Sequence, residues 1–305
     1  MLRGLLLLVA LWLPFCARAL DAPGTITVLE GDALIYRAAG RVQAAEGVRL
    51  ALGDIIESAP STFMQIELPD QGVLQLGPET RAMLGGGATR QKPERWLFVM
   101  NGWCKVTGPK APVEGQLPVD IRTRWFDLPS NPGVVVFQAT PTEVTAFAEH
   151  GDIRLAERQA SGSPVGVVLR SGDYYHRRWP ERGAMNPGST SAFVAAMPRS
   201  FRDSLPARIA KYRDDDVRAK DATDFVYVDV EAWLKAETWI RRPLMQRWRA
   251  KARDPAFRAS LIANLSSHPE WDPILFPEKY IKKEVVRRPA PPPPPAVPAS
   301  IPSTQ

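Results

Sequence analysis

The sequence predicts a mainly β fold that is followed by a small helical region and a proline-rich end. The first observation is a series of short segments, between residues 24 and 180, in which apolar and polar residues alternate. The second is that these segments are closed by Gly and Pro, often beside Asp, which are the residues that tight turns require. The third is a change near residue 184, after which apolar residues recur at helical spacing.

The length and composition are those of a globular protein. The chain has 305 residues, enough for one large or two modest domains, with 45% hydrophobic and 24% charged residues. The formal charge of +6 is mild, and the Lys and Arg residues are spread along the chain. Since nucleic-acid binding needs a concentrated basic surface, we expect no nucleic acid among the partners.

Residues 1–19 predict a secretory signal peptide. Arg3 gives a positive start, the apolar run from Leu5 to Phe15 is short for a bilayer span, and Ala17-Arg18-Ala19 has the small-x-small pattern of a cleavage site. We expect a periplasmic protein with no stable membrane anchor after cleavage; an uncleaved anchor is the alternative. Cleavage would remove Cys16 and leave Cys104 without an internal disulfide partner, so the fold must depend on its core.

Residues 20–183 are expected to form one all-β domain with two similar halves, at about 24–90 and 91–180. In the segment Met64-Gln65-Ile66-Glu67-Leu68 the apolar side chains fall on one face of a strand and the polar ones on the other. Further along, Asn101-Gly102 predicts a hairpin between WLFVM and WCKV.

One phrase occurs twice, as GVRLALGDIIE from Gly47 and as GVVLRSGDYYH from Gly166. Each copy contains a Gly-Asp pair, and a second Gly-Asp pair precedes each copy. Four pairs are therefore expected to be structural turns: Gly31-Asp32, Gly53-Asp54, Gly151-Asp152 and Gly172-Asp173. The match indicates either an internal duplication or one β fold with two similar edges.

Residues 184–283 are expected to form a helical domain. Ser191, Asp229 and Asp254 are placed as helix caps, and Leu244 and Trp248 are spaced to line one buried face. The remaining residues, 284–305, include RRPAPPPPPAVP and are expected to be a disordered tail with polyproline II character.

The chain offers few residues for catalysis or metal binding. It has three histidines, and no HExxH, CxxC, HxH, GxSxG or SxxK pattern is present. We therefore predict no catalytic, metal or cofactor site, and no enzyme activity. The carboxylates Glu57, Glu67 and Glu149 remain as an alternative, in which a dispersed site would cleave an envelope polymer.

Most tryptophans are expected in the core. Trp125, Phe126 and Trp179 are less patterned, and we place them as surface contacts. Exposed aromatic rings could stack on sugars, so a peptidoglycan-binding protein is a second alternative.

Three motifs in the β region together resemble the FecR domain. Gly53-Asp54-Ile55-Ile56, Asp70-Gln71-Gly72 and Leu76-Gly77-Pro78 fit the family's Gly-Asp-x-Ile, its Asp-x-Gly-type turn and its Leu-Gly-Pro before a final strand. The resemblance covers roughly residues 24–178. It implies an all-β periplasmic module that works by binding. The best-known members hold a cytoplasmic anti-sigma segment and read a TonB-dependent receptor, whereas a signal peptide stands in that place here.

These observations predict a non-enzymatic periplasmic module for binding, scaffolding or signal sensing. Its expected partner is another envelope protein, with peptidoglycan as the alternative partner. We expect recognition through loops and strand edges, because an exposed edge strand can add a partner's strand to its sheet.

Overall fold

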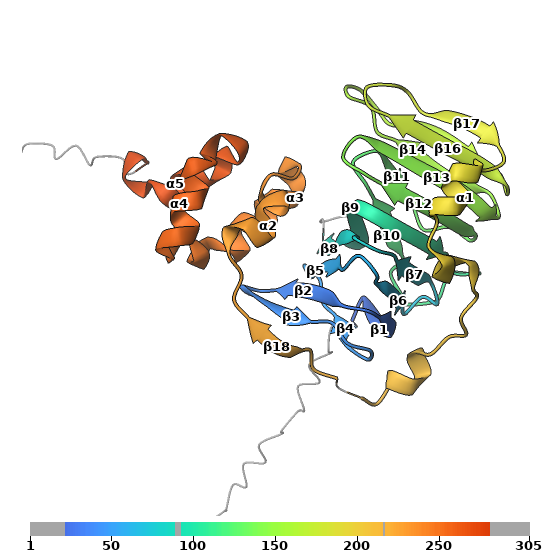
Figure 1. Ribbon diagram of the computed structural model, residues 1–305, viewed down its shortest axis with the longest axis horizontal. Coiled ribbons are helices and arrows are strands. Elements are labelled where there is room, and N and C mark those ends of the chain that lie inside the picture. Colours follow the sequence, from blue (N-terminus) through green and yellow to red (C-terminus); the bar gives the residue numbers. More distant parts are fainter. Residues whose placement is uncertain (1–21, 89–92, 216, 281–305) are drawn as a thin grey trace, which may run out of the picture. The chain divides into compact units, whose positions relative to one another are not determined.

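The computed structural model describes residues 22–88, 93–215 and 217–280. The chain divides into two units, with the boundary between Val226 and Tyr227. The first unit is mainly β and the second is helical (Figure 1). The expected signal peptide and the expected proline-rich tail lie outside the described residues.

One layer of the first unit, sheet A, is antiparallel throughout the described pairings. Its strands, in spatial order, are β4 (Arg49–Leu50), β1 (Gly24–Glu30), β6 (Phe63–Glu67), β7 (Val73–Leu76), part of β9 (Pro93–Thr107), β12 (Val134–Ala139), β13 (Glu143–His150), β16 (Asp173–Arg178) and β17 (Ala184–Pro187).

The other layer, sheet B, has one parallel pair, β9 with β10. Its strands, in spatial order, are β18 (Lys220–Thr223), β3 (Gly40–Gln43), β2 (Ala33–Arg37), β5 (Ile55–Ser58), β8 (Arg81–Ala88), the rest of β9, β10 (Val119–Arg122), β11 (Phe126–Leu128), β14 (Ile153–Glu157) and β15 (Val165–Leu169).

Strand β9 belongs to both sheets. Its first part pairs with β8 and β10, and its last part pairs with β7 and β12. Asn101-Gly102, expected to be a hairpin, lies inside this continuous strand, so that prediction is wrong. Gly102 has a φ of +104°, and the bend there carries the strand from one layer to the other.

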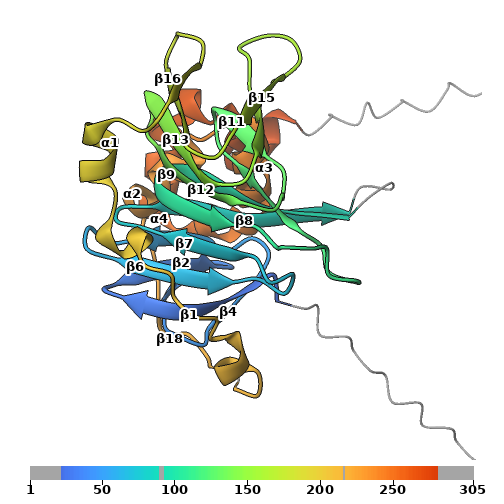
Figure 2. The same cartoon turned by 90° about the vertical axis from the view of Figure 1, so that its right-hand side faces the viewer.

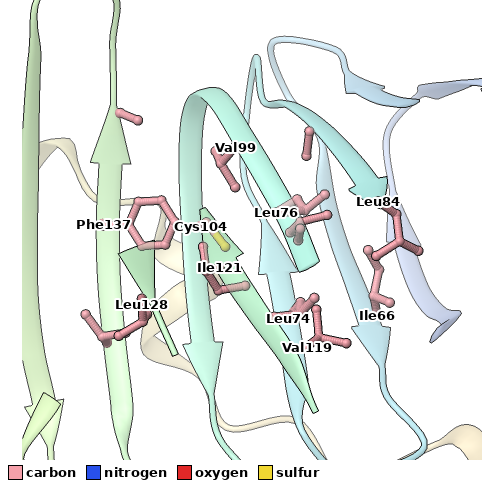
Figure 3. Packing of buried hydrophobic residues seen from close by; sticks show 14 of the residues in the cluster. Ile66, Leu74, Leu76, Leu84, Val99, Cys104, Val119, Ile121, Leu128 and Phe137 are labelled. Carbon is pink, nitrogen blue, oxygen red and sulfur yellow. The ribbon is translucent and has the colours of Figure 1, made fainter. Parts of the chain in front are cut away.

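The two sheets pack face to face around an apolar core. Ile66, Leu76 and Cys104 come from sheet A, and Leu84 and Ile121 come from sheet B (Figure 3). Met64, Ile66 and Leu68, the apolar residues of the alternating segment, all lie in this core. The mainly β prediction is confirmed by these two layers.

A segment after β17 crosses the outer face of sheet A, and we call residues 188–215 the strap. It contains α1 (Ser191–Ala196) and two short 3₁₀ turns, η1 (Arg199–Arg202) and η2 (Ile209–Tyr212) (Figure 2). Phe193 packs against Trp103 at 5.3 Å between ring centroids, and Phe201 against Phe63 at 6.2 Å. The outer face of sheet A is therefore a second apolar interface.

The strap shows why the unit boundary differs from the expected one at residue 184. After the strap, β18 pairs with β3 at the edge of sheet B. Residues 184–226 thus supply two strands and a covering segment to the β unit. In this range the structure has helix only in α1 and in the short 3₁₀ turns η1 and η2. The apolar residues of the range pack on a sheet and do not form a helical core.

The second unit is helical within the described residues. It contains α2 (Tyr227–Leu234), α3 (Thr238–Arg247), η3 (Arg249–Arg253), α4 (Pro255–Ala263), η4 (Leu265–Ser267), η5 (Pro269–Trp271), α5 (Asp272–Leu275) and η6 (Pro277–Lys279). Asp254 caps α4, because its carboxylate accepts a hydrogen bond of 2.7 Å from the Phe257 N–H. Trp233, Trp248 and Trp271 are among the fully buried residues of this unit.

Candidate functional site

Strand β15 (Figure 2) lies at one edge of sheet B, and its sequence is apolar. Among the described residues it pairs with β14 alone, so one side of its backbone faces no other strand. Val165 and Val168 are 52% and 48% exposed. A Cβ at Gly166 would meet nothing within 4 Å. The face of the sheet is open at Gly166, and the unpaired side of the β15 backbone is the place where another extended chain could pair.

The other strands that end a sheet are shorter or carry features that discourage pairing. In sheet A, β4 has two residues and β17 ends at Pro187. In sheet B, β18 has four residues and begins with Lys220. Short length, proline and charge are the common means by which proteins protect sheet edges. The sequence of β15, VGVVL, has neither proline nor charge.

The hairpin that carries β15 is held firmly at both ends. At one end Leu169 pairs with Ile153, and both are buried in the core between the sheets. At the other end Glu157 accepts a hydrogen bond of 2.9 Å from the Tyr175 hydroxyl. Burial and then the Glu157 carboxylate raise the pKa of Tyr175, so this bond persists over the ordinary pH range.

Arg177 completes the network around Glu157. Its Nη1 lies 3.5 Å from the Glu157 carboxylate and donates to the Arg158 carbonyl oxygen at 2.6 Å. Both charged side chains are buried, so removing either would leave an uncompensated charge. Strand β14 is thereby fixed, and it presents β15 as a preformed edge.

A separate pocket lies where the β6–β7 turn meets two loops. It has a volume of about 200 Å³, and Asp70, Lys110, Gln116 and Asn131 are among its lining residues. A narrow cavity behind it, about 20 Å³, lies between the sheets and is also lined by Asp70 and Asn131.

All four Gly-Asp pairs lie at turns with a left-handed glycine. The φ angles are +83° at Gly31, +91° at Gly53, +77° at Gly151 and +92° at Gly172. Gly31-Asp32 leads from β1 to β2, and Gly151-Asp152 leads from β13 to β14. Both pairs therefore carry the chain from sheet A to sheet B.

The repeated phrase encodes the same turn in two places. The Asp54 carboxylate accepts a hydrogen bond of 2.8 Å from the Ala51 N–H, and the Asp173 carboxylate accepts one of 2.8 Å from the Arg170 N–H. The strands around the turn differ, however. Gly53-Asp54 enters sheet B at β5, whereas Gly172-Asp173 enters sheet A at β16. The matching residues thus specify a turn but not a matching place in the fold.

Trp125 and Phe126 are corrected from surface contacts to core residues, at 3% and 1% exposed. The Trp125 indole N–H donates to the Thr140 carbonyl oxygen at 3.2 Å, and Phe126 packs edge-on against Phe137. Strand β11 has three residues, too few for alternation to reveal its buried face. Trp179 is 60% exposed.

The three carboxylates of the enzyme alternative each have a separate partner. Glu57 lies 3.5 Å from Arg81, and Glu149 lies 2.7 Å from Lys105. Glu67 accepts hydrogen bonds from the backbone N–H groups of Arg208 at 2.7 Å and Ile209 at 3.0 Å. These contacts assign the three carboxylates to different structural roles.

Two further findings concern the described residues as a whole. Within residues 22–88, 93–215 and 217–280, no group of three or more His, Cys, Asp or Glu side chains is arranged to hold a metal ion. Over the same ranges, no helix has the length and apolar character needed to cross a membrane.

The edge strand and the buried aspartate were not singled out by the sequence. In GVVLR two adjacent valines hide the alternation, and which strand ends a sheet depends on distant pairings. Asp70 belongs to the expected Asp-x-Gly-type turn, and this turn motif does not show that the second carboxylate oxygen is buried. The preceding segment SGSP, at residues 161–164, is the one local signal that β15 follows an exposed loop.

No family model matches this chain, and no curated protein matches it. Among solved structures, two crystal structures described as a "putative anti-sigma factor" from Parabacteroides distasonis ATCC 8503 are similar to parts of it. Each has 14% sequence identity and a TM-score of 0.36. They cover 47% and 46% of this chain, which in turn spans 64% and 63% of theirs.

Proposed function

We propose that this chain is a non-enzymatic periplasmic binding module of the FecR-domain type. Its partner would be another envelope protein, which contributes an extended segment to sheet B beside β15. In this role the chain acts as a scaffold or signal sensor and needs no cofactor. The signal peptide expected at residues 1–19 would deliver it to the periplasm.

The observation that carries this proposal is the unprotected edge of β15. Strand addition provides main-chain hydrogen bonds for affinity and alternate side-chain contacts for specificity. Val168 and Val165 would give apolar contacts, and the unpaired side of the β15 backbone would supply the main-chain hydrogen bonds. Because the hairpin is fixed at both ends, the partner would bind a preformed edge at a smaller ordering cost.

The residues around β15 indicate the partner's chemistry. Arg154, opposite Val168 on β14, and Arg170, which follows β15, are both exposed. A partner strand with apolar residues in its centre would contact the exposed valines of β15, and Asp or Glu at one end would pair with these arginines. Exposed ion pairs of this kind favour the correct register more than they add affinity.

The test is crosslinking in intact cells, followed by purification of the protein and mass spectrometry of what is bound. One dominant envelope protein, lost when both Val165 and Val168 are replaced by Lys, supports strand addition. Val194, which is 40% exposed on α1, supplies the control substitution to Lys. Equal recovery of that protein with the Val165→Lys/Val168→Lys variant and with the Val194→Lys control contradicts the proposal.

Peptidoglycan binding remains a second candidate, because Trp179 presents an exposed ring. Exposed aromatic rings are suited to stacking on sugars. In a pull-down with purified sacculi, this alternative requires retention that is lost in Trp179→Ala. It also requires that Val165→Lys and Val168→Lys be retained normally.

A further inference from the structure

The pocket beside the β6–β7 turn is lined by both apolar and polar residues. Prolines 109, 112, 118 and 132 line it, together with Val113 and Ala111. Its volume of about 200 Å³ is below that of pockets for drug-sized ligands and suits a single side chain or a small amine.

Two residues that line this pocket each carry a buried acceptor oxygen with no donor among the described residues. Asp70 is 3% exposed, and its Oδ1 accepts from the Gly72 N–H at 2.9 Å, while its Oδ2 has no hydrogen-bond partner among the described residues. The Asn131 amide donates to the Pro129 carbonyl oxygen at 2.7 Å, while its Oδ1 is likewise buried without a partner there. Both residues line the pocket and the narrow cavity behind it.

Such acceptors are costly when they stay unsatisfied. A buried polar atom without a hydrogen bond destabilises the folded protein, and a buried carboxylate does so more strongly. Burial raises the pKa of Asp70, and the Gly72 N–H and the charge of Arg95 oppose that rise. A ligand that brings donors and a positive charge would therefore remove a penalty that the free protein carries.

We propose that this pocket binds a primary ammonium group on an unbranched apolar stem, such as a lysine side chain presented by a peptide or protein. The ammonium would donate to Asp70 Oδ2 and Asn131 Oδ1, and the stem would lie against the prolines. Two buried acceptors that have no donor among the described residues favour a ligand that donates hydrogen bonds. The small volume favours a linear amine over a ring.

Lys110 at the exposed rim gives the proposal an internal check. Its like charge disfavours an arriving cation, so Lys110→Ala should bind the amine more tightly. This inference is independent of the edge strand, since β15 contributes no residue to the pocket. Loss of one site would leave the other intact.

The experiment is an NMR titration of the isotopically labelled full chain, in which the backbone amide signals are monitored. The probe is Nα-acetyl-lysine methylamide, and the control probe is the same compound acetylated on Nε, which is uncharged. We expect the charged probe to shift the Ser130 and Gln116 amides and the neutral probe to leave them unchanged. Equal shifts from both probes, or none from either, would overturn the proposal.

The variants separate a ligand site from a structural role. Asp70→Asn keeps an acceptor for the Gly72 N–H but removes the charge. The dissociation constant of the charged probe should therefore rise at least tenfold. Asp152→Asn, at an exposed turn, is the matched control and should bind normally. Should Asp70→Asn fail to fold, Asn131→Ala must weaken binding severalfold; normal binding by either folded variant contradicts the ammonium site.

Discussion

A Cβ on Gly102 would lie 2.4 Å from the Cα of Thr80. The Thr80 hydroxyl also accepts a hydrogen bond of 3.1 Å from the Trp103 N–H, directly after the glycine. Close backbone approach and a left-handed φ therefore coincide at the point where β9 passes from sheet B to sheet A. The continuity of the two layers depends on this contact.

Gly102→Ala is expected to destabilise the β unit by about 2–4 kcal/mol, because it adds backbone strain and a clash with Thr80. Urea unfolding monitored by circular dichroism measures the change. Gly115→Ala is the matched control: its φ is +75°, but a Cβ there meets nothing within 4 Å. Equal losses for both variants would show that the contact with Thr80 contributes nothing.

Glu67→Gln is expected to loosen the strap. The Glu67 carboxylate accepts hydrogen bonds from two backbone N–H groups, and an amide can offer only one oxygen. We therefore expect the free energy of unfolding to fall by about 1–3 kcal/mol. Limited proteolysis should then cleave the strap near Arg208 faster. Glu57→Gln, which disrupts a partly exposed pair with Arg81 and lies outside the strap, should be cleaved there at the rate of the parent protein. Unchanged cleavage of Glu67→Gln would show that the strap is held by its aromatic residues alone.

Cys104 is expected to be unreactive in the folded protein. It is fully buried between the sheets, and burial raises the pKa of its thiol well above the ordinary range. Since the thiolate is the reactive form, a maleimide should label Cys104 only after denaturation. A cysteine placed at Ser163, in the exposed loop before β15, should be labelled at once in the native state. Rapid native labelling of Cys104 would contradict the packing of this core.

Asp70 should make stability depend on pH. Because its pKa is raised on folding, the folded state binds the proton more tightly, and stability falls as pH rises through the window above the unfolded pKa. Asp70→Asn removes this effect, so the variant should gain stability relative to the parent as the pH rises above about 4, the ordinary pKa of an aspartate. Parallel stability curves for the two proteins over that range would show that Asp70 is not desolvated.

Local patterns predicted most of what is local in this fold. The strand at Met64–Glu67, the cap at Asp254 and the Gly-Asp turns follow from residue spacing and from the special geometry of glycine. The same Gly-Asp motif could not reveal that one copy enters sheet B and the other sheet A, because that choice depends on the partner strand.

The misplaced features depend on long-range pairing. Trp125 and Phe126 are buried because β11 lies between β10 and β14, and Asn101-Gly102 is a bend because β9 has different neighbours on either side of it. Residues 184–226 join the β unit through β18, which pairs with a strand about 180 residues earlier. None of these relations is encoded within a short window of sequence.

The exposed edge of β15 is the centre of the proposed function, and site-specific crosslinking tests it most directly. A photoreactive residue at Val168 should capture a single envelope protein in intact cells, and one at Val194 should capture none. Mass spectrometry of the crosslinked peptide should identify an extended apolar segment of that partner. Capture of the same protein at Val194, or at neither position while the partner still co-purifies, would contradict strand addition at β15.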